Sequence, residues 1–173
     1  MKLINYKLKN GDVTIGNVRL TTRESDGALL MGIDETYWLE DNDLYIYGFC
    51  KELPSLEFNS ILIGGLGMGL IPYWIHQNRN VETLEIVEIN KNVIDCVLSQ
   101  GYLQGVVVYN GDALYIDNFQ KYDLIIMDLW WLLPEDFESQ KQQIISNYSN
   151  NLNENGKIYF PASQEIIRYD EII

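Results

Sequence analysis

A glycine-rich stretch, GGLGMG at residues 64–69, has the residue types and the spacing of a ligand-binding loop. It follows a short apolar run that predicts a strand, and it precedes a predicted helix. Glycines let the chain turn tightly and let a ligand approach the backbone, while the helix N-terminus adds free N–H groups. Gly65, Gly67 and Gly69 form G-x-G-x-G rather than the G-x-G-x-x-G of dinucleotide loops. This tighter spacing favours a ligand without a pyrophosphate, whose amino-acid tail lies beside the loop.

Two acidic residues follow the next two predicted strands. Glu88 lies roughly 20 residues beyond the glycines, where an acid binds ribose hydroxyls, and its neighbour Ile89 is included in the same site. Asp112 could accept a hydrogen bond from an adenine amino group while Ala113 lies near the ring. The structural alternatives are a solvated strand-end acid for Glu88 and a helix N-cap for Asp112. Three such features after three consecutive strands favour nucleotide binding.

The elements that must position these residues alternate between strand and helix from residue 59 onward. Strands that are apolar throughout and joined by helices form a parallel sheet covered on both faces. The predicted fold class is therefore α/β, with a Rossmann-like, mostly parallel sheet whose ligands bind at the carboxyl ends of the strands. The predicted strands are 60–64, 83–89, 105–109, 123–129 and, after Asn155-Gly156, 157–160; the predicted helices are 69–78, 90–100 and 135–150.

The first third of the chain predicts a small β-rich domain. Asn10-Gly11, a pair typical of tight hairpin turns, joins two alternating, β-like segments. A short helix is predicted at about 43–52, before a shift in composition. We place the domain boundary there, which gives an N-terminal β-hairpin domain at 1–54 and a nucleotide-binding domain at 55–173.

Charge and composition limit the partners of the chain. With 25 acidic and 12 basic residues, its net charge is −13, and no Lys or Arg cluster is available to neutralise phosphates, so nucleic-acid binding is not expected. No apolar run approaches the ~20 residues of a membrane helix. We expect a cytoplasmic protein with Cys50 and Cys96 as free thiols. One histidine and two distant cysteines leave no candidate metal site.

The segments ILIGGLGMG, LEIVEIN, YNGDA and YDLIIMDLWW together resemble the class I S-adenosylmethionine-dependent methyltransferase fold. More narrowly, residues 44–165 resemble spermidine synthase and the spermidine-synthase-like methyltransferases. The resemblance implies S-adenosylmethionine, or its decarboxylated form, as cofactor. It also implies that the three glycines form the cofactor loop and that the two acids bind ribose and adenine. We further expect a small-molecule substrate such as an amine, and a homodimer.

Carried over to this sequence, the resemblance makes Asp128 the catalytic aspartate. Its carboxylate would orient a nucleophilic amine or accept its proton. A structural strand-end acid is the alternative. Trp130 and Trp131 could stack on a substrate or lie over an ammonium group, or one of them could belong to the core.

Three departures from the family bear on the reaction. Met68 and Trp131 stand where the aminopropyl transferases carry aspartates. The full fold also has two further strands after Phe160, so the last predicted strand is an open edge unless residues 165–173 or a second subunit covers it. These departures favour methyl transfer to a small nucleophile over aminopropyl transfer to a polyamine. The further alternative is a non-catalytic module that binds a nucleoside or a partner.

Overall fold

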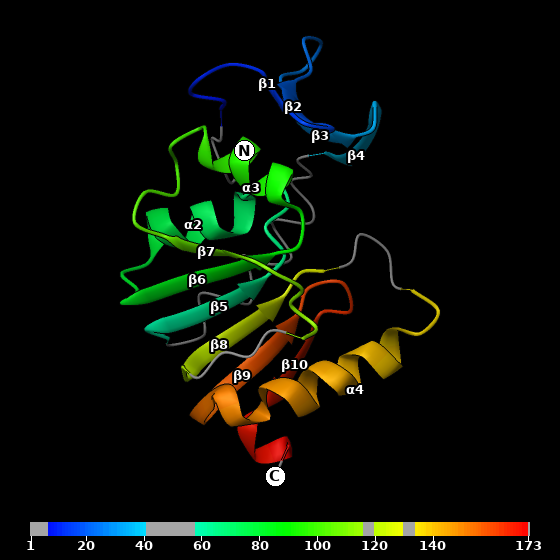
Figure 1. Ribbon diagram of the computed structural model, residues 1–173. Coiled ribbons are helices and arrows are strands. Elements are labelled where there is room, and N and C mark those ends of the chain that lie inside the picture. Colours follow the sequence, from blue (N-terminus) through cyan, green and yellow to red (C-terminus); the bar gives the residue numbers. More distant parts are fainter. Residues whose placement is uncertain (1–6, 41–57, 116–119, 130–133, 173) are drawn as a thin grey trace.

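The computed structural model describes residues 7–40, 58–115, 120–129 and 134–172 of the chain (Figure 1). Several sequence predictions lie outside these residues. They are the short helix at 43–52, the domain boundary, Cys50, Trp130 and Trp131.

The main sheet has six strands in the order β10-β9-β8-β5-β6-β7. Strands β5 to β9 are parallel and β10 is antiparallel to β9, so the predicted α/β fold with a mostly parallel sheet is confirmed. The chain runs outward from β5 through β6 to β7 and then returns to the other side of β5 as β8. The order therefore reverses between β5 and β8, where open α/β sheets bind ligands. The bounds are β5 (Ser60–Gly64), β6 (Thr83–Glu88), β7 (Val107–Asn110), β8 (Tyr122–Met127), β9 (Leu152–Phe160) and β10 (Glu165–Arg168).

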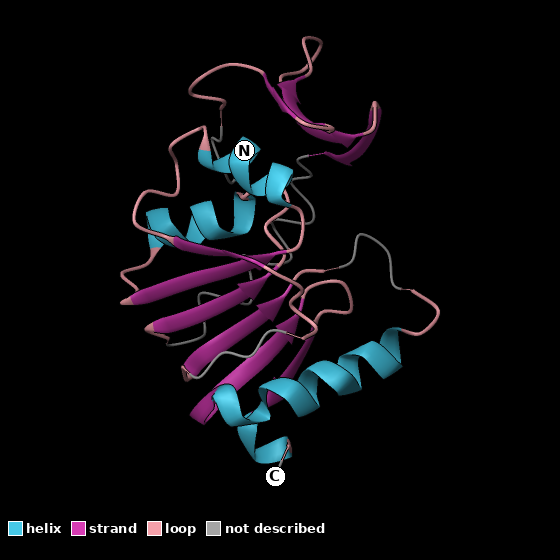
Figure 2. Ribbon diagram, in the orientation of Figure 1, coloured by secondary structure: helices cyan, strands magenta, loops and turns pink. Residues whose placement is uncertain are grey.

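Helices cover both faces of this sheet (Figure 2). α2 (Leu70–Asn78) and α3 (Lys91–Leu98) lie on one face, and α4 (Phe137–Tyr148) lies on the other. Pro72 falls in the first turn of α2, where its missing N–H leaves no bond unmade. The 3-10 turns Ser149–Asn151 and Tyr169–Glu171 follow α4 and β10.

Side-chain alternation along the strands divides the core in two. Ile61 and Ile63 of β5 pack in one cluster with the buried residues of α2 and α3. Leu62, between them, packs in a second cluster with Ile144 and Tyr148 of α4. A strand buried on both faces has no polar side to show to water, which explains the continuous apolar run in the sequence.

The N-terminal sheet has four antiparallel strands in sequential order, and it packs against α3. They are β1 (Val13–Ile15), β2 (Val18–Thr22), β3 (Leu29–Ile33) and β4 (Thr36–Glu40). Buried side chains of β2 and β3 belong to the same cluster as those of α3, so the two sheets share this apolar core. In Figure 1 the N-terminal sheet lies on the side of α2 and α3, away from α4.

The predicted hairpin at Asn10-Gly11 is wrong. The first hairpin turns at Gly16-Asn17, between β1 and β2. Asn10 instead meets the end of α3, where its N–H donates to Gln100 Oε1 at 3.1 Å and its side-chain amide donates to the Ser99 carbonyl at 2.5 Å. The last carbonyls of a helix lack partners within the helix. This long-range contact therefore outweighs the local turn preference of Asn-Gly.

The last parallel strand is longer than predicted. β9 starts at Leu152 and continues through Asn155-Gly156, whereas the sequence predicted a strand only after this pair, at 157–160. Tyr122 pairs with Leu152 but Leu124 pairs with Lys157, so the extra residues form an irregularity inside the strand. A side chain at Gly156 would come within 2.9 Å of the Tyr122 carbonyl, which explains the glycine.

β10 covers the edge of β9 that the sequence left open. Of the two coverings considered, the structure shows the chain's own residues 165–168. Lys141 of α4, only 6% exposed, donates to Glu165 of β10 at 2.9 Å and pairs with Glu138 at 2.7 Å. The ion pair of this buried ammonium group with Glu165 connects the edge strand β10 to α4.

Cys96 is a buried free thiol on α3. Its Sγ lies 3.5 Å from the Val18 carbonyl of the N-terminal sheet, and burial raises its pKa. Among the described residues, no helix is long and apolar enough to cross a membrane.

Asp123 joins the amino ends of β5, β8 and β9. Its Oδ2 accepts from the N–H groups of Asn59 at 2.8 Å and Ser60 at 3.0 Å, and its Oδ1 accepts from the Asn153 amide at 2.6 Å. Burial raises the pKa of this carboxyl, but the hydrogen bonds outweigh burial and hold the pKa of Asp123 below its usual value.

We expect Asp123→Asn to lower the free energy of unfolding at pH 7 by about 2–3 kcal/mol, because the carboxylate loses charge-assisted bonds. The folded pKa lies below the unfolded value of about 4. The stabilisation is therefore complete above pH ~5 and is lost as the pH falls below ~4. Urea unfolding across this range measures it. Glu154→Gln, at an exposed acid in the same irregularity, is the control, and a loss that stays constant down to pH 3 contradicts the assignment.

Candidate functional site

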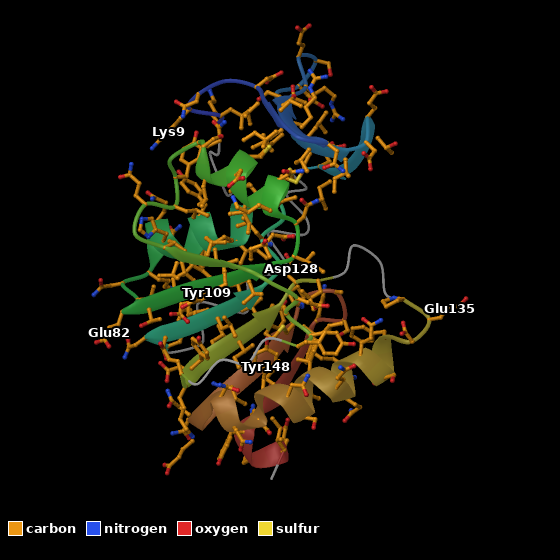
Figure 3. All side chains as sticks on the ribbon, in the orientation of Figure 1. Lys9, Glu82, Tyr109, Asp128, Glu135 and Tyr148 are labelled. Carbon is orange, nitrogen blue, oxygen red and sulfur yellow. The ribbon has the colours of Figure 1, made fainter. Side chains whose placement is uncertain are left out.

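The carboxyl ends of four neighbouring strands bring the predicted site residues to one edge of the main sheet. Gly64, the last residue of β5, pairs with Val87 of β6 and with Met127 of β8, and Glu88 pairs with Asn110 of β7. In Figure 1 the arrowheads of these strands point the same way, and Figure 3 shows Asp128 at that edge. The glycine loop, Glu88, Asp112 and Asp128 are thus neighbours in the fold.

The glycine loop has a backbone that only glycine adopts without strain. Gly65, Gly67 and Gly69 have positive φ angles of 90°, 49° and 77°. A Cβ at Gly65 would lie 2.2 Å from the Asp128 carbonyl oxygen, and one at Gly69 would lie 2.7 Å from Val97 Cγ1. The spacing G-x-G-x-G is therefore required both by backbone conformation and by close packing.

Backbone hydrogen bonds hold the loop between β6 and β8. The Gly65 N–H donates to the Val87 carbonyl at 2.8 Å, and the Asp128 N–H donates to the Gly64 carbonyl at 2.8 Å. Met68 is only 5% exposed and belongs to the core. The Met68 side chain is therefore not exposed at this edge of the sheet.

Glu88 is a buried acid with both carboxylate oxygens in use, so it is not a solvated strand-end acid. Its side chain is 8% exposed. Oε2 accepts from the Leu66 N–H in the glycine loop at 2.9 Å, and Oε1 accepts from the Asn90 N–H at the start of α3 at 2.8 Å. Each oxygen has one further lone pair for a ligand hydroxyl.

Asp112 begins a short turn after β7. Its Oδ1 accepts from the Leu114 N–H at 2.9 Å, and its carbonyl accepts from the Tyr115 N–H at 3.0 Å, so the side chain caps this turn. The helix that Asp112 was considered to cap would extend into residues 116–119, which lie outside the described part of the chain. Within the described parts of the chain, Oδ2 has no hydrogen-bond partner. Ile89 is 67% exposed at the adjacent strand end, whereas Ala113 is 4% exposed. The site thus combines an available acceptor with an exposed apolar side chain.

Asn110 and Leu39 also shape the site, although the sequence analysis did not select them. The Asn110 amide donates to the carbonyls of Glu88 and Ile89, both at 2.9 Å. Leu39 Cδ1 of β4 lies 3.4 Å from where a Cβ at Gly67 would be, so the N-terminal sheet touches the glycine loop. Asn110 could have been selected from the sequence because it belongs to the same Asn-Gly-Asp motif as Asp112. The Leu39 contact depends on the docking of the N-terminal sheet, which no local pattern encodes.

Asp128 lies directly after β8 and is partly buried. Its position beside the glycine loop follows from the backbone bond to Gly64, which ties the end of β8 to that of β5. Trp130 and Trp131, the candidate substrate residues, fall outside the described part of the chain. Within that part, no group of three His, Cys, Asp or Glu residues is placed to hold a metal ion.

No protein-family model and no curated protein sequence matches this chain. Its fold is shared with solved methyltransferase structures. The N-methyltransferase NodS from Bradyrhizobium japonicum matches 68% of this chain and 65% of its own length, with 16% identity and a TM-score of 0.54. The ribosomal protein L11 methylase from Lactobacillus delbrueckii subsp. bulgaricus matches 68% and 57%, with 18% identity and a TM-score of 0.52.

A third neighbour is an S-adenosylmethionine-dependent methyltransferase from Clostridium acetobutylicum. It matches 67% of this chain and 47% of its own length, with 19% identity and a TM-score of 0.50. The chain thus spans about half to two thirds of these structures. The fold is that of class I S-adenosylmethionine-dependent methyltransferases.

We expect Gly65→Ala to destabilise the protein by about 3 kcal/mol or more, because positive φ and overpacking add together. Gly105→Ala is the matched control. Its φ is +84°, and nothing lies within 4 Å of the added Cβ, so only the backbone cost of about 1–2 kcal/mol remains. Urea unfolding of both variants measures the difference. Equal losses of unfolding free energy in the two variants would show that a Cβ at Gly65 does not clash with the Asp128 carbonyl.

Proposed function

We propose that this chain binds S-adenosylmethionine and transfers its methyl group to a small nucleophile. The observation that carries the proposal is the Glu88 carboxylate, which lies at the end of β6 and binds the glycine loop. The positive-φ loop lies at the point where the strand order reverses. The fold shared with methyltransferases supports the same reading, and NodS has been crystallised with S-adenosylhomocysteine.

The residues at this edge fit the parts of that cofactor. The free lone pairs of Glu88 suit the two ribose hydroxyls, and Asp112 Oδ2 suits the 6-amino group of adenine. Ile89 offers apolar surface to the ring. Among the described residues, the N–H groups of Gly67 and Met68 have no partner, and they suit the carboxylate of the methionine end.

When bound, S-adenosylmethionine supplies a methyl carbon made electrophilic by its sulfonium. In methyl transfer that carbon would pass to the lone pair of the nucleophile, and the sulfur would keep the electron pair of the broken sulfur–carbon bond. Asp128, beside the loop, orients an amine and accepts the proton that the amine releases. The partly buried position of Asp128 at the sheet edge suits this role.

The burial of Met68 favours methyl transfer over aminopropyl transfer. Without an acid in the loop, nothing at that position would neutralise the amine of the decarboxylated cofactor. We keep aminopropyl transfer to a polyamine as the second candidate because the net charge of −13 suits a cationic acceptor.

Calorimetric titration separates these candidates. We expect S-adenosylmethionine and methylthioadenosine to bind and NAD not to bind. Preference for decarboxylated S-adenosylmethionine would favour the second candidate. Binding of NAD alone, or of none of these ligands, would overturn the proposal.

A ligand-deletion cycle tests the role of Glu88. We expect wild type to bind S-adenosylhomocysteine about 10- to 100-fold more tightly than its 2′,3′-dideoxy analogue, because bonds to a carboxylate are lost. For Glu88→Gln the difference should fall to within about threefold.

The control for this cycle is Glu85→Gln, at another buried acid on β6. Glu85 accepts from the hydroxyls of Tyr109 and Tyr122 instead of the loop. This variant should keep the wild-type difference. An undiminished difference in Glu88→Gln would remove the ribose assignment.

Asp128→Asn should bind S-adenosylhomocysteine within about twofold of wild type but slow methyl transfer by about 10²- to 10⁴-fold, as expected for loss of a proton acceptor. Transfer of a labelled methyl group to a panel of small amines measures the rate. Glu135→Gln, at an exposed acid before α4 that Figure 3 shows away from the sheet edge, is the control. An unchanged rate in Asp128→Asn would show that this carboxylate takes no part.

A further inference from the structure

The last two residues of α4 hold the turn that carries Asp112 and Ala113. The Tyr148 hydroxyl donates to the Ala113 carbonyl at 2.6 Å, and the Asn147 amide donates to the Leu114 carbonyl at 2.6 Å. Figure 3 shows Tyr148 extending from α4 toward the main sheet. The bonds join segments more than 30 residues apart, so the position of the turn depends on the packing of α4.

The environment of Tyr148 keeps its hydroxyl protonated, so that it donates a hydrogen bond. Its side chain is 1% exposed and lies in the core cluster under the sheet. Burial and the nearby negative charge of Asp112 both raise the pKa of this hydroxyl, so it stays protonated at neutral pH. A buried hydroxyl that has one strong acceptor fixes that acceptor in place.

Ala113 is also fixed from the other side. A Cβ at Gly64 would lie 3.1 Å from Ala113 Cβ, so Ala113 lies directly against the start of the glycine loop. Asp112 Oδ1 is bound to the Leu114 N–H, which sets the orientation of its carboxylate. The direction of Asp112 Oδ2 therefore depends on the positions of Ala113 and Leu114. The carbonyls of both residues accept hydrogen bonds from α4.

We propose that Tyr148 and Asn147 are positioning residues for adenine recognition, an inference that rests on the cofactor site proposed above. They hold the turn so that Asp112 accepts from the 6-amino group of adenine. Hypoxanthine has an oxygen at that position, and an oxygen facing a carboxylate lacks a proton to share. The turn held by α4 therefore sets the preference for adenine, although neither Tyr148 nor Asn147 contacts the base.

Calorimetry with S-adenosylhomocysteine and S-inosylhomocysteine tests this inference through the ratio of the two affinities. We expect wild type to prefer the adenine form by about 10- to 100-fold, as for hydrogen bonds to charged groups. Tyr148→Phe should reduce this ratio at least threefold, and Asn147→Ala should reduce it to a smaller extent.

Tyr122→Phe is the matched control. Tyr122 is also fully buried, but its hydroxyl donates to Glu85, away from the turn. It should keep the wild-type ratio, because a ratio of two ligands cancels general destabilisation. If Tyr148→Phe does not fold, the affinity ratio of Asn147→Ala tests the inference instead. Asn147 is exposed, so its substitution leaves the core intact.

Two outcomes overturn the inference in distinguishable ways. If wild type binds neither ligand, the proposed function and this inference fail together. If wild type prefers the adenine form and folded Tyr148→Phe or Asn147→Ala keeps the same ratio, the inference alone fails.

Discussion

The buried carboxylate of Glu88 is the interaction on which the site depends. It accepts one N–H from the glycine loop and one from the residue that caps α3. Burying a charge is costly unless hydrogen bonds compensate it, and here two backbone donors do so. One side chain therefore fixes the loop after β5 relative to the end of β6. In the proposed complex the same carboxylate also accepts from the ribose hydroxyls.

The rest of the fold keeps this arrangement in place from both faces of the sheet. On one face, the N-terminal sheet packs on α3, and Leu39 reaches the glycine loop. On the other face, α4 holds the turn after β7 and, through Lys141, the edge strand β10. Parts distant in sequence thus converge on a few backbone segments at the carboxyl ends of the strands. This convergence explains why a short, glycine-rich edge can hold a defined geometry.

The sequence correctly predicted those parts of the structure that depend on neighbouring residues in the chain. The continuous apolar runs identified the parallel strands, and the glycine spacing matched the positive-φ positions of the loop. It failed where a distant partner competes with a local preference. Asn10 binds the end of α3 instead of turning a hairpin. Gly156 lies within β9, where the Tyr122 carbonyl of β8 leaves no room for a side chain. Tyr148 was missed because a helical tyrosine shows its acceptor only in the folded chain.

The most direct test is a crystal structure of the chain with S-adenosylhomocysteine. We expect both ribose hydroxyls within about 3 Å of the Glu88 carboxylate. We also expect the adenine ring beside Ile89 and the amino-acid end along the glycine loop, with the Leu66 and Asn90 N–H bonds retained. A ligand bound elsewhere, or one whose ribose does not contact Glu88, would contradict the proposed site.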